Sequence, residues 1–393
     1  MQARVQAGVR SRMDQELAAT LTRWRRHLHA HPELSRGEHE TAAFIAARLT
    51  ELGVPHETAV GGTGVVGTLA RGASNRSVGL RADMDALPIV EATALPYASA
   101  NPGVMHACGH DGHMTSLLGA AALLARDSGW HGVVQLIFQP AEEGQGGARA
   151  MVADGLFDRF PMERVFGFHN WPGVAAGTVV VHEGAVMSSA ARMEIVLEGH
   201  AGHAAMPHLT RDPMLAAAHL TVALQSVVSR QVDPLEAAVV SVTMIDGGSA
   251  PNQIPQRATL RGTFRTFKPA VRDQVEAAIR QIVAGIAQAF GMAASVAIRH
   301  GADATVNSPA EAAMAVEAAE AAGLVLRRDL PPTMASEDFG VYLEQRPGVF
   351  AWIGNGPAED GRALHNARYD FNDAILPAAA TWMAAVAKRA LAG

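Results

Sequence analysis

The segment from His106 to His113 brings a thiol and imidazoles together over a short stretch. It reads His-Ala-Cys-Gly-His-Asp-Gly-His and contains Cys108, the only cysteine of the chain. A thiolate with nearby imidazoles is the donor set that borderline transition metals prefer. Gly109 and Gly112 let the backbone bend so that several ligands can face one point. Taken alone, the segment could equally be a histidine-rich surface loop with a free thiol.

Further acidic and imidazole side chains follow short apolar segments that are predicted β-strands. These segments are residues 78–81, 133–138 and 165–168. The polar residues after them are Asp83, Glu142, Glu143 and His169. Ligands of open α/β sheets bind beyond the carboxyl ends of the strands, so these groups and the Cys108 loop are expected along one edge. The recurrence of such groups at strand ends favours a metal site over a surface loop.

Each of these residues has an ordinary alternative. Glu142 and Glu143 are adjacent after a strand, so one carboxylate could bind a metal while the other serves as a general base. An acidic loop is the alternative. His169 and His365 could each be a ligand or a polar surface residue. Asp83 could orient a ligating imidazole by accepting its distal N–H, or it could cap a turn.

Three further residues are candidates for contacts with a substrate. The segment from Gly199 to His208 carries three histidines but no acidic or thiolate partner, which favours hydrogen bonding to a substrate over a second metal site. A turn with exposed imidazoles is the alternative. Asn252 and Arg265 are candidate anion binders, because an arginine can donate two parallel hydrogen bonds to one carboxylate. A solvated arginine on a strand is more common.

Composition and charge narrow the classes of protein. The chain has 393 residues, of which 49% are hydrophobic and 18% charged, as expected for a globular protein with a buried core. The net charge is −6 without basic blocks, which argues against nucleic acid or a membrane as partner. No apolar run reaches the length of a membrane span, and the first residues lack a signal-peptide core. One cysteine suits a reducing compartment, so a cytoplasmic location is expected.

The pattern of elements changes along the chain. Strands alternate with helices up to about residue 188, which predicts an α/β domain with a central mixed, largely parallel sheet flanked by helices. Residues 189–301 follow the order β-α-β-β-α-β, which predicts an inserted ferredoxin-like α+β dimerisation domain. The catalytic metal-binding domain is therefore expected to be discontinuous, formed by residues 1–188 and 302–393. The first strand of the insertion is predicted over residues 192–198, and its sheet edges could pair between subunits of a homodimer or a higher homo-oligomer.

Several motifs together resemble the dinuclear-metal amidohydrolases and peptidases of the aminoacylase and carboxypeptidase G type. The nearest branch contains hippurate hydrolases, other N-acyl-amino-acid amidohydrolases and auxin-conjugate hydrolases. The resemblance runs nearly end to end. The motifs that carry it are Arg25-Arg-His-Leu-His-Ala-His-Pro-Glu33, Arg81-Ala-Asp-Met-Asp-Ala-Leu-Pro88, Met105-His-Ala-Cys-Gly-His-Asp-Gly-His113, Gln139-Pro-Ala-Glu-Glu-Gly144, the Gly199–His208 segment, Ser336-Glu-Asp-Phe339 and the His365 segment.

The resemblance implies a role for each candidate residue. It implies that Cys108 bridges two divalent metals, Mn or Zn with Co or Ni also suitable. The remaining implied ligands are His110 and His169 for one metal and Glu143 and His365 for the other. Glu142 would be the general base and acid, Asp83 would orient the site from behind, and His203 would contact the substrate carbonyl, often from the partner subunit. Asn252 and Arg265 would hold the substrate's carboxylate. Arg81 stands where many relatives have a ligating histidine, which fits the branch with a thiolate ligand.

The implied activity is metal-dependent hydrolysis of the amide bond of small-molecule N-acyl amino acids, such as hippurate. Two alternatives remain at this point. The same fold and metals could act on a dipeptide, as a dipeptidase or carboxypeptidase, or on an N-carbamoyl amino acid. The chain could also be a scaffold or binding protein without activity, although a lapsed site has no chemical need for Cys108, His110, Glu142, Glu143, His169 and His365 together.

Overall fold

The computed structural model describes residues 15–392, and the chain divides into two compact units. The first unit contains the described residues up to Val186, Thr305–Pro332 and the residues from Asp338 onward. The second unit contains Met187–Ala304 together with Thr333–Glu337. One segment thus leaves the first unit and returns to it, and each unit has its own hydrophobic core.

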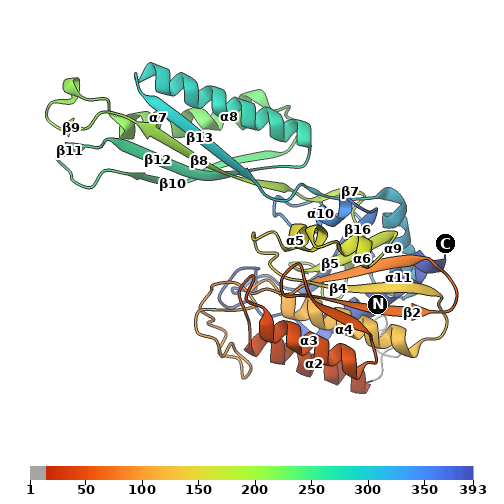
Figure 1. The fold of residues 1–393 in the computed structure, drawn as a ribbon. Helices are drawn as coiled ribbons and strands as arrows, with labels where there is room; N and C mark the ends of the chain where they lie inside the picture. The colour runs from red at the N-terminus through yellow and green to blue at the C-terminus, as the bar shows by residue number, and fades with distance from the viewer. Residues whose placement is uncertain (1–14, 393) are drawn as a thin grey trace. The chain divides into compact units, whose positions relative to one another are not determined.

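A mixed sheet forms the centre of the first unit (Figure 1). Its strands are β1 (His56–Val60), β2 (Gly64–Arg71), β3 (Ser77–Asp83), β4 (Gly132–Gln139), β5 (Arg164–Pro172), β6 (Val179–Val180), β15 (Leu326–Arg327) and β16 (Gly348–Gly356). The order across the sheet is β1-β2-β4-β3-β5-β16-β6-β15. The four neighbours β4, β3, β5 and β16 are parallel, so their carboxyl ends lie at one edge. The expected α/β class with a mixed sheet is confirmed.

Helices flank this sheet. They are α2 (Gln15–Ala30), α3 (His39–Glu51), α4 (His110–Arg126), α5 (Gly147–Ala153), α6 (Leu156–Arg159), α9 (Pro309–Ala321), α10 (Gly340–Leu343) and α11 (Leu376–Ala392). Most of α4 is buried, because it packs against α2, α11 and the central strands. A Cβ added at Gly119 would lie 2.8 Å from both Ala380 and Leu21, so these three helices approach closely. This packing fixes the first turn of α4, which follows Cys108.

The second unit is an α+β module. Its four-stranded sheet and the two helices that accompany it are, in chain order, β8 (Ser189–Glu198), α7 (Pro213–Ser226), β10 (Ala238–Gly247), β12 (Arg257–Thr266), α8 (Pro269–Ala289) and β13 (Ala293–His300). The expected β-α-β-β-α-β order is therefore observed, in an antiparallel sheet ordered β10-β12-β8-β13. The first strand, predicted over residues 192–198, lies inside the sheet, and the edges are β10 and β13. A role of this unit in dimerisation stays a prediction.

Three local differences from the expected elements bear on the site. Helix α4 begins at His110, whereas propensity alone predicts a start at Met114, because Gly112 and the histidines before it are weak helix formers. Strand β5 continues to Pro172, so His169 lies within the strand and not after it. The antiparallel strands β1 and β2 were not predicted, since most residues of β1 are polar or exposed and a glycine interrupts the short apolar run of β2.

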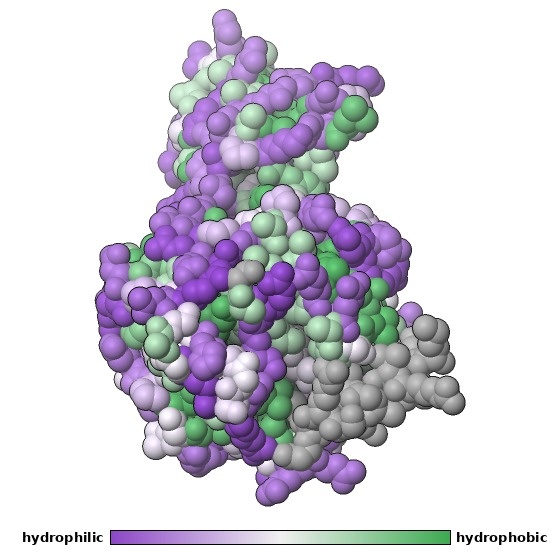
Figure 2. Space-filling model, turned by 90° about the vertical axis from the view of Figure 1, so that its right-hand side faces the viewer, coloured by the Kyte–Doolittle hydropathy of each residue, from purple (hydrophilic) through white to green (hydrophobic). Residues whose placement is uncertain are grey.

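The surface of the described residues carries no broad apolar area on the face seen in Figure 2, where hydrophobic residues are scattered among hydrophilic ones. No helix of residues 15–392 is long and apolar enough to cross a membrane. Exposed large hydrophobic side chains do occur along the edge strand β10, at Val239, Met244 and Ile245.

A buried ionic network holds α2 against the start of α4. Nδ1 of His29 lies 2.8 Å from Oδ2 of Asp111, and its Nε2 lies 3.2 Å from Glu91. Arg25, also buried, donates to Asp370 at 2.8 Å and to Asp373 at 2.6 Å. Burial alone would lower the pKa of His29, but its hydrogen bonds to Asp111 and Glu91 raise the pKa to about 9. The imidazolium form of His29 therefore stabilises the fold.

We expect His29→Gln to destabilise the protein more at pH 6.5 than at pH 9.5. The pKa of His29 in the folded state, about 9, exceeds its ordinary value of 6.5. The stabilisation is therefore complete below about pH 6.5 and is lost as the pH rises through 9. Removing one partner of a buried ion pair costs about 3 kcal/mol at the lower pH. Denaturant unfolding at both pH values measures this, with the exposed His131→Gln as control. An equal loss of unfolding free energy at both pH values would contradict the assignment.

Candidate metal centre

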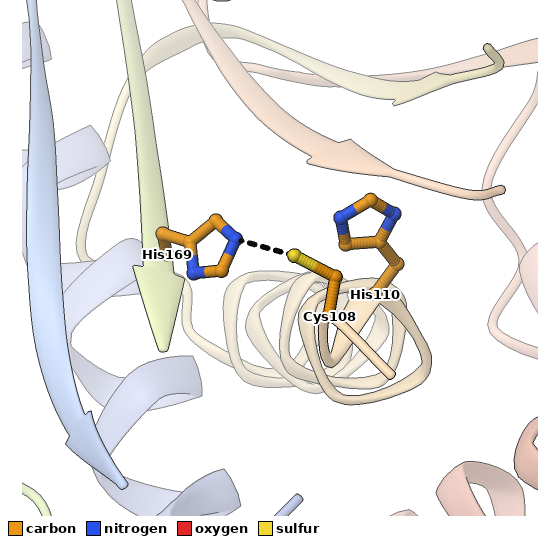
Figure 3. Close-up of side chains that lie close together, drawn as sticks. All are labelled: Cys108, His110 and His169. Carbon is orange, nitrogen blue, oxygen red and sulfur yellow. Dashed lines mark hydrogen bonds between the residues drawn. The ribbon is translucent and has the colours of Figure 1, made fainter. Parts of the chain in front are cut away.

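The structure brings the predicted ligands together in two sets that share one sulfur. Cys108, His110 and His169 form the first set, whose ligand atoms all lie within 4.8 Å of one another. Sγ of Cys108 is 3.3 Å from Nε2 of His169, and the His110 ring lies on the other side of the sulfur (Figure 3). Cys108, Glu143 and His365 form the second set within the same limit, with Nε2 of His365 3.3 Å from Oε1 of Glu143. Cys108 is thus placed between two groups of ligands.

Local backbone geometry places Cys108 and His365. Gly109 follows the cysteine with φ 92°, and a Cβ there would lie 2.3 Å from Oδ1 of Asn170, so only glycine fits this position. The turn lets His110 begin α4 directly after the sulfur. His365 has φ 61°, and its N–H donates to the carbonyl of Ala107 at 2.8 Å. The His365 loop is therefore tied to the loop that carries Cys108.

The two imidazoles of the first set each use one nitrogen to bond to the backbone. Nδ1 of His110 lies 2.7 Å from the carbonyl of Asp85, and Nδ1 of His169 lies 2.7 Å from the carbonyl of Asn170. A carbonyl can only accept, so both Nδ1 atoms carry the proton in the neutral rings. Both Nε2 atoms then have a free lone pair, which is the tautomer that a metal ligand requires.

Asp85 holds both acidic residues after β4. Its Oδ1 accepts from the backbone N–H of Glu142 at 3.0 Å, and its Oδ2 accepts from that of Glu143 at 3.0 Å. Ser35 adds a third hydrogen bond of 2.6 Å to Oδ2. Hydrogen bonds to the Asp85 carboxylate, from His110 among others, lower its pKa although burial acts in the opposite direction. One buried carboxylate therefore fixes the backbone of the predicted base and of a predicted ligand.

Asp83 lies behind the first set, but it bonds to a different histidine from those predicted as ligands. Its Oδ1 is 2.6 Å from Nδ1 of His113, and its Oδ2 accepts from Arg81 at 2.8 Å. Oδ2 is 3.6 Å from Nε2 of His110. Burial would raise the pKa of Asp83, but His110, His113 and Arg81 hold it well below its usual range. The distal N–H of His110 goes to the Asp85 carbonyl, so Asp83 orients His113 directly.

Arg81, which the resemblance of the motifs places at the position of a ligating histidine in other relatives, is buried. It donates to Gln139 at 2.9 Å, to Asp83 at 2.8 Å and to Asp338 at 3.1 Å. These bonds connect the carboxyl ends of β3 and β4 with the segment before α10. Arg81 therefore has a structural role in this chain, and a guanidinium cannot serve as a metal ligand.

The donor set fits two metal ions. Nε2 of His110 is buried and has no hydrogen-bond partner within the described part of the chain, as expected for an atom that binds a cation. Burial, with Glu143 and Glu142 close by, raises the pKa of the Cys108 thiol well above its usual range. Burial lowers the pKa of His110, but Asp83 and Asp85 outweigh it and raise the pKa to about 10. A metal ion would replace these protons and compensate the buried negative charge.

Glu142 lies beside both ligand sets. Its carboxylate also falls within 4.8 Å of His110 and Glu143, and its Oε1 accepts from the N–H of Asp338 at 3.4 Å. It is partly buried, unlike the fully buried Asp83 and Asp85. This carboxylate is close enough to the metal ligands to exchange a proton with a molecule bound there.

The three predicted substrate contacts all lie in the second unit, but not in one place. His203 is in β9 (Gly202–His203), which pairs with β11 (Gln253–Ile254), so Asn252 is adjacent to it. Arg265 lies near the opposite end of β12, eight residues from Arg257, which corresponds to about 26 Å along the strand. Nη1 of Arg265 is buried without a hydrogen-bond partner among residues 15–392, and this burial lowers its pKa. One chain therefore does not bring Asn252 and Arg265 together.

Sequence reasoning missed several residues that position the ligands. Asp85 could have been proposed together with Asp83, because residues two apart in an extended segment point to the same face. Asn170 and Tyr369 gave no usable signal. Oδ1 of Asn170 lies 2.7 Å from Nε2 of His113, and its amide donates to the Tyr369 hydroxyl at 2.6 Å. These contacts join segments far apart in the chain.

Comparison with known proteins decides the family. The family model for "Peptidase family M20/M25/M40" matches residues 79–389. The chain belongs to this family. The resemblance inferred from the motifs is therefore confirmed.

Relatives of known name cover nearly the whole chain. The hippurate hydrolase of Campylobacter jejuni is 42% identical over 96% of this chain and 98% of its own. An N-acetyl-L-cysteine deacetylase of Bacillus subtilis is 41% identical over 93% of this chain and 87% of its own. Among solved structures, the YXEP protein of Bacillus subtilis, described as a dinuclear metal binding peptidase, has a TM-score of 0.85 at 34% identity, covering 96% and 99% of the two chains. Together with the two ligand sets, this supports a site for two metal ions.

We expect Asp85→Asn to reduce metal affinity or activity by about 10- to 100-fold, the usual effect of removing a residue that holds metal ligands. The amide would place a donor against one of the two N–H groups and leave it unpaired. Metal content after dialysis against a weak chelator measures the effect. Ser35→Ala is the matched control, since it removes a bond to Asp85 and keeps both backbone bonds. If the two variants retain equal metal, Asp85 has no special role.

Proposed function

We propose that this chain hydrolyses the amide bond of N-acyl amino acids and releases a carboxylic acid and a free amino acid. The observation that carries the proposal is the pair of ligand sets sharing Cys108, with the Glu142 carboxylate beside them. The hippurate hydrolase and the deacetylase among the relatives act on substrates of this class, as their names state. The position of Glu142 beside the ligand sets supports the same reaction for this chain.

Cys108, His110 and His169 would hold one divalent metal ion, and Cys108, Glu143 and His365 the other. When bound, the two ions would lower the pKa of water and polarise the amide carbonyl. A thiolate ligand favours Mn or Zn, with Co or Ni as alternatives, over Mg or Ca. A reducing compartment such as the cytoplasm suits this site, because the sulfur must stay unoxidised to serve as a ligand.

Glu142 would be the general base and then the general acid. Its carboxylate would accept a proton from the attacking water and donate that proton to the amide nitrogen as the C–N bond breaks. The water oxygen remains in the carboxylic acid product, and the amino acid leaves with a neutral amine. Asp85 supports this role by fixing the backbone of Glu142, so the carboxylate is held in place before substrate binds. Asp83 would act behind the site through His113.

His203, Asn252 and Arg265 would contact the substrate, with His203 at the carbonyl and the other two at the carboxylate. A carboxylate is far smaller than the distance of about 26 Å along β12, so Asn252 and Arg265 of one chain do not hold the same group. A homodimer resolves this, with His203 and Asn252 contributed by the second copy. The exposed apolar side chains of the edge strand β10 support pairing between copies.

Glu142→Gln should keep its metal and lose about 10²- to 10⁴-fold in kcat, the usual contribution of a general base. Glu143→Gln is the matched comparison and should lose metal as well as activity. Initial rates with hippurate, N-acetylcysteine and a dipeptide, together with metal content, distinguish the two variants. Hydrolysis by Glu142→Gln at the wild-type rate would show that another group is the base. A tenfold preference for the dipeptide would overturn the substrate class.

Light scattering should show a dimer for the wild-type protein and dissociation for Ile245→Lys, because a charge on β10 opposes pairing at this edge. Leu235→Lys is the control, since Leu235 is 93% exposed in the same unit and lies outside β10. A strictly monomeric wild-type protein would contradict the proposed contribution of His203 from a second copy.

A further inference from the structure

A cavity lies in the first unit, between residues 92–95 and the segment from Asn355 to Asn372. Its volume is about 570 Å³, which suits a small organic molecule. The two walls are joined by a hydrogen bond of 2.7 Å from the N–H of Ala92 to the carbonyl of Ala367. None of the five proposed metal ligands is among its lining residues.

Two arginines give this cavity unpaired positive charge. Arg362 and Arg368 both line it, and neither guanidinium has a hydrogen bond or ion pair with any described residue. Asp370 is the acidic residue of the lining, but its carboxylate already pairs with Arg25 at 2.8 Å and accepts from the Tyr97 hydroxyl at 2.8 Å. The two free guanidiniums therefore lack an anion.

The rest of the cavity lining consists of hydrogen-bonded asparagines and apolar side chains. Asn372 donates from its backbone to Oδ1 of Asn355 at 2.9 Å and from its side chain to the Asn355 carbonyl at 3.1 Å. Leu95 and Phe371 supply apolar surface in the lining. Two guanidinium groups beside apolar side chains suit a ligand that has a carboxylate and a small apolar group.

We propose that this cavity binds a small organic carboxylate through Arg362 and Arg368, and that the bound ligand stabilises the loop carrying His365. His365 is three residues from each arginine, so a ligand held by both would clamp the loop on either side of it. The His365 backbone adopts φ 61°, a conformation uncommon for a residue with a side chain, so clamping the loop would help to maintain it. Phe371 connects the cavity to α4, since a Cβ at Gly112 would lie 2.2 Å from its ring.

The binding part of this inference is independent of the proposed function. The coupling part depends on it, because His365 is a metal ligand only in that proposal. A carboxylic acid is also a product of the proposed reaction, so such a site would let product affect retention of the metal. Product at this cavity would act without occupying the catalytic centre.

The test uses calorimetric titration of the metal-loaded full-length protein with benzoate and, separately, with inorganic phosphate. Arg362→Gln/Arg368→Gln should weaken benzoate binding at least tenfold. Arg230→Gln/Arg299→Gln removes the same charge from exposed positions of the second unit and should leave binding unchanged. Equal benzoate affinity in both double variants would overturn the site. Phosphate bound as tightly as benzoate would overturn the assignment to an organic carboxylate.

The coupling has its own measurement, which is the rate at which a chelator removes metal. Benzoate should slow metal release from the wild type and from Arg230→Gln/Arg299→Gln, but not from Arg362→Gln/Arg368→Gln. An equal effect of benzoate on all three proteins would overturn the coupling. None of these readouts requires turnover. If the protein failed to hydrolyse any N-acyl amino acid, the proposed function would be wrong, but the binding result would still hold.

Discussion

The buried sulfur of Cys108 is the constraint on which the site depends. A thiolate in this position needs positive charge beside it, because burial and the neighbouring carboxylates disfavour its ionised form. The surrounding ligands come from the first turn of α4, the loop after β4, strand β5 and the loop after β16. The fold brings these four segments to one edge because β4, β3, β5 and β16 run parallel. Two cations shared by the sulfur, as proposed above, would balance charges that the protein alone leaves uncompensated.

Groups behind the ligands hold that arrangement in place. Asp85 accepts hydrogen bonds from the backbones of both glutamates. Backbone carbonyls fix the tautomers of His110 and His169. Asp83 bonds to His113 behind these ligands. Such contacts let the ligands stay close before a metal binds, which reduces the reorganisation that binding costs. Cys108, His110 and His169 are thus buried ligands, whereas His365 is exposed.

Much of this could be predicted from the sequence, for physical reasons that can be named. Continuous apolar segments identified β3, β4 and β5, and the polar residues following them identified the edge where ligands meet. The start of α4 at His110 could not be predicted, because tertiary packing against α2 and α11 overrides the low helix propensity of Gly112. The order of the strands in the second unit could not be predicted from the sequence either, and the strand predicted over residues 192–198 lies in the interior of the sheet, between β12 and β13. The separation of Asn252 from Arg265 follows instead from the extended length of β12, which lies between them.

X-ray absorption at the metal edge of the metal-loaded protein measures whether Cys108 bridges two ions. With two zinc ions per chain, we expect a sulfur neighbour at about 2.3 Å from each ion. The average would be one sulfur per metal, although the chain has a single cysteine. A sulfur count near one half per metal, or none, would show that Cys108 does not bridge two ions.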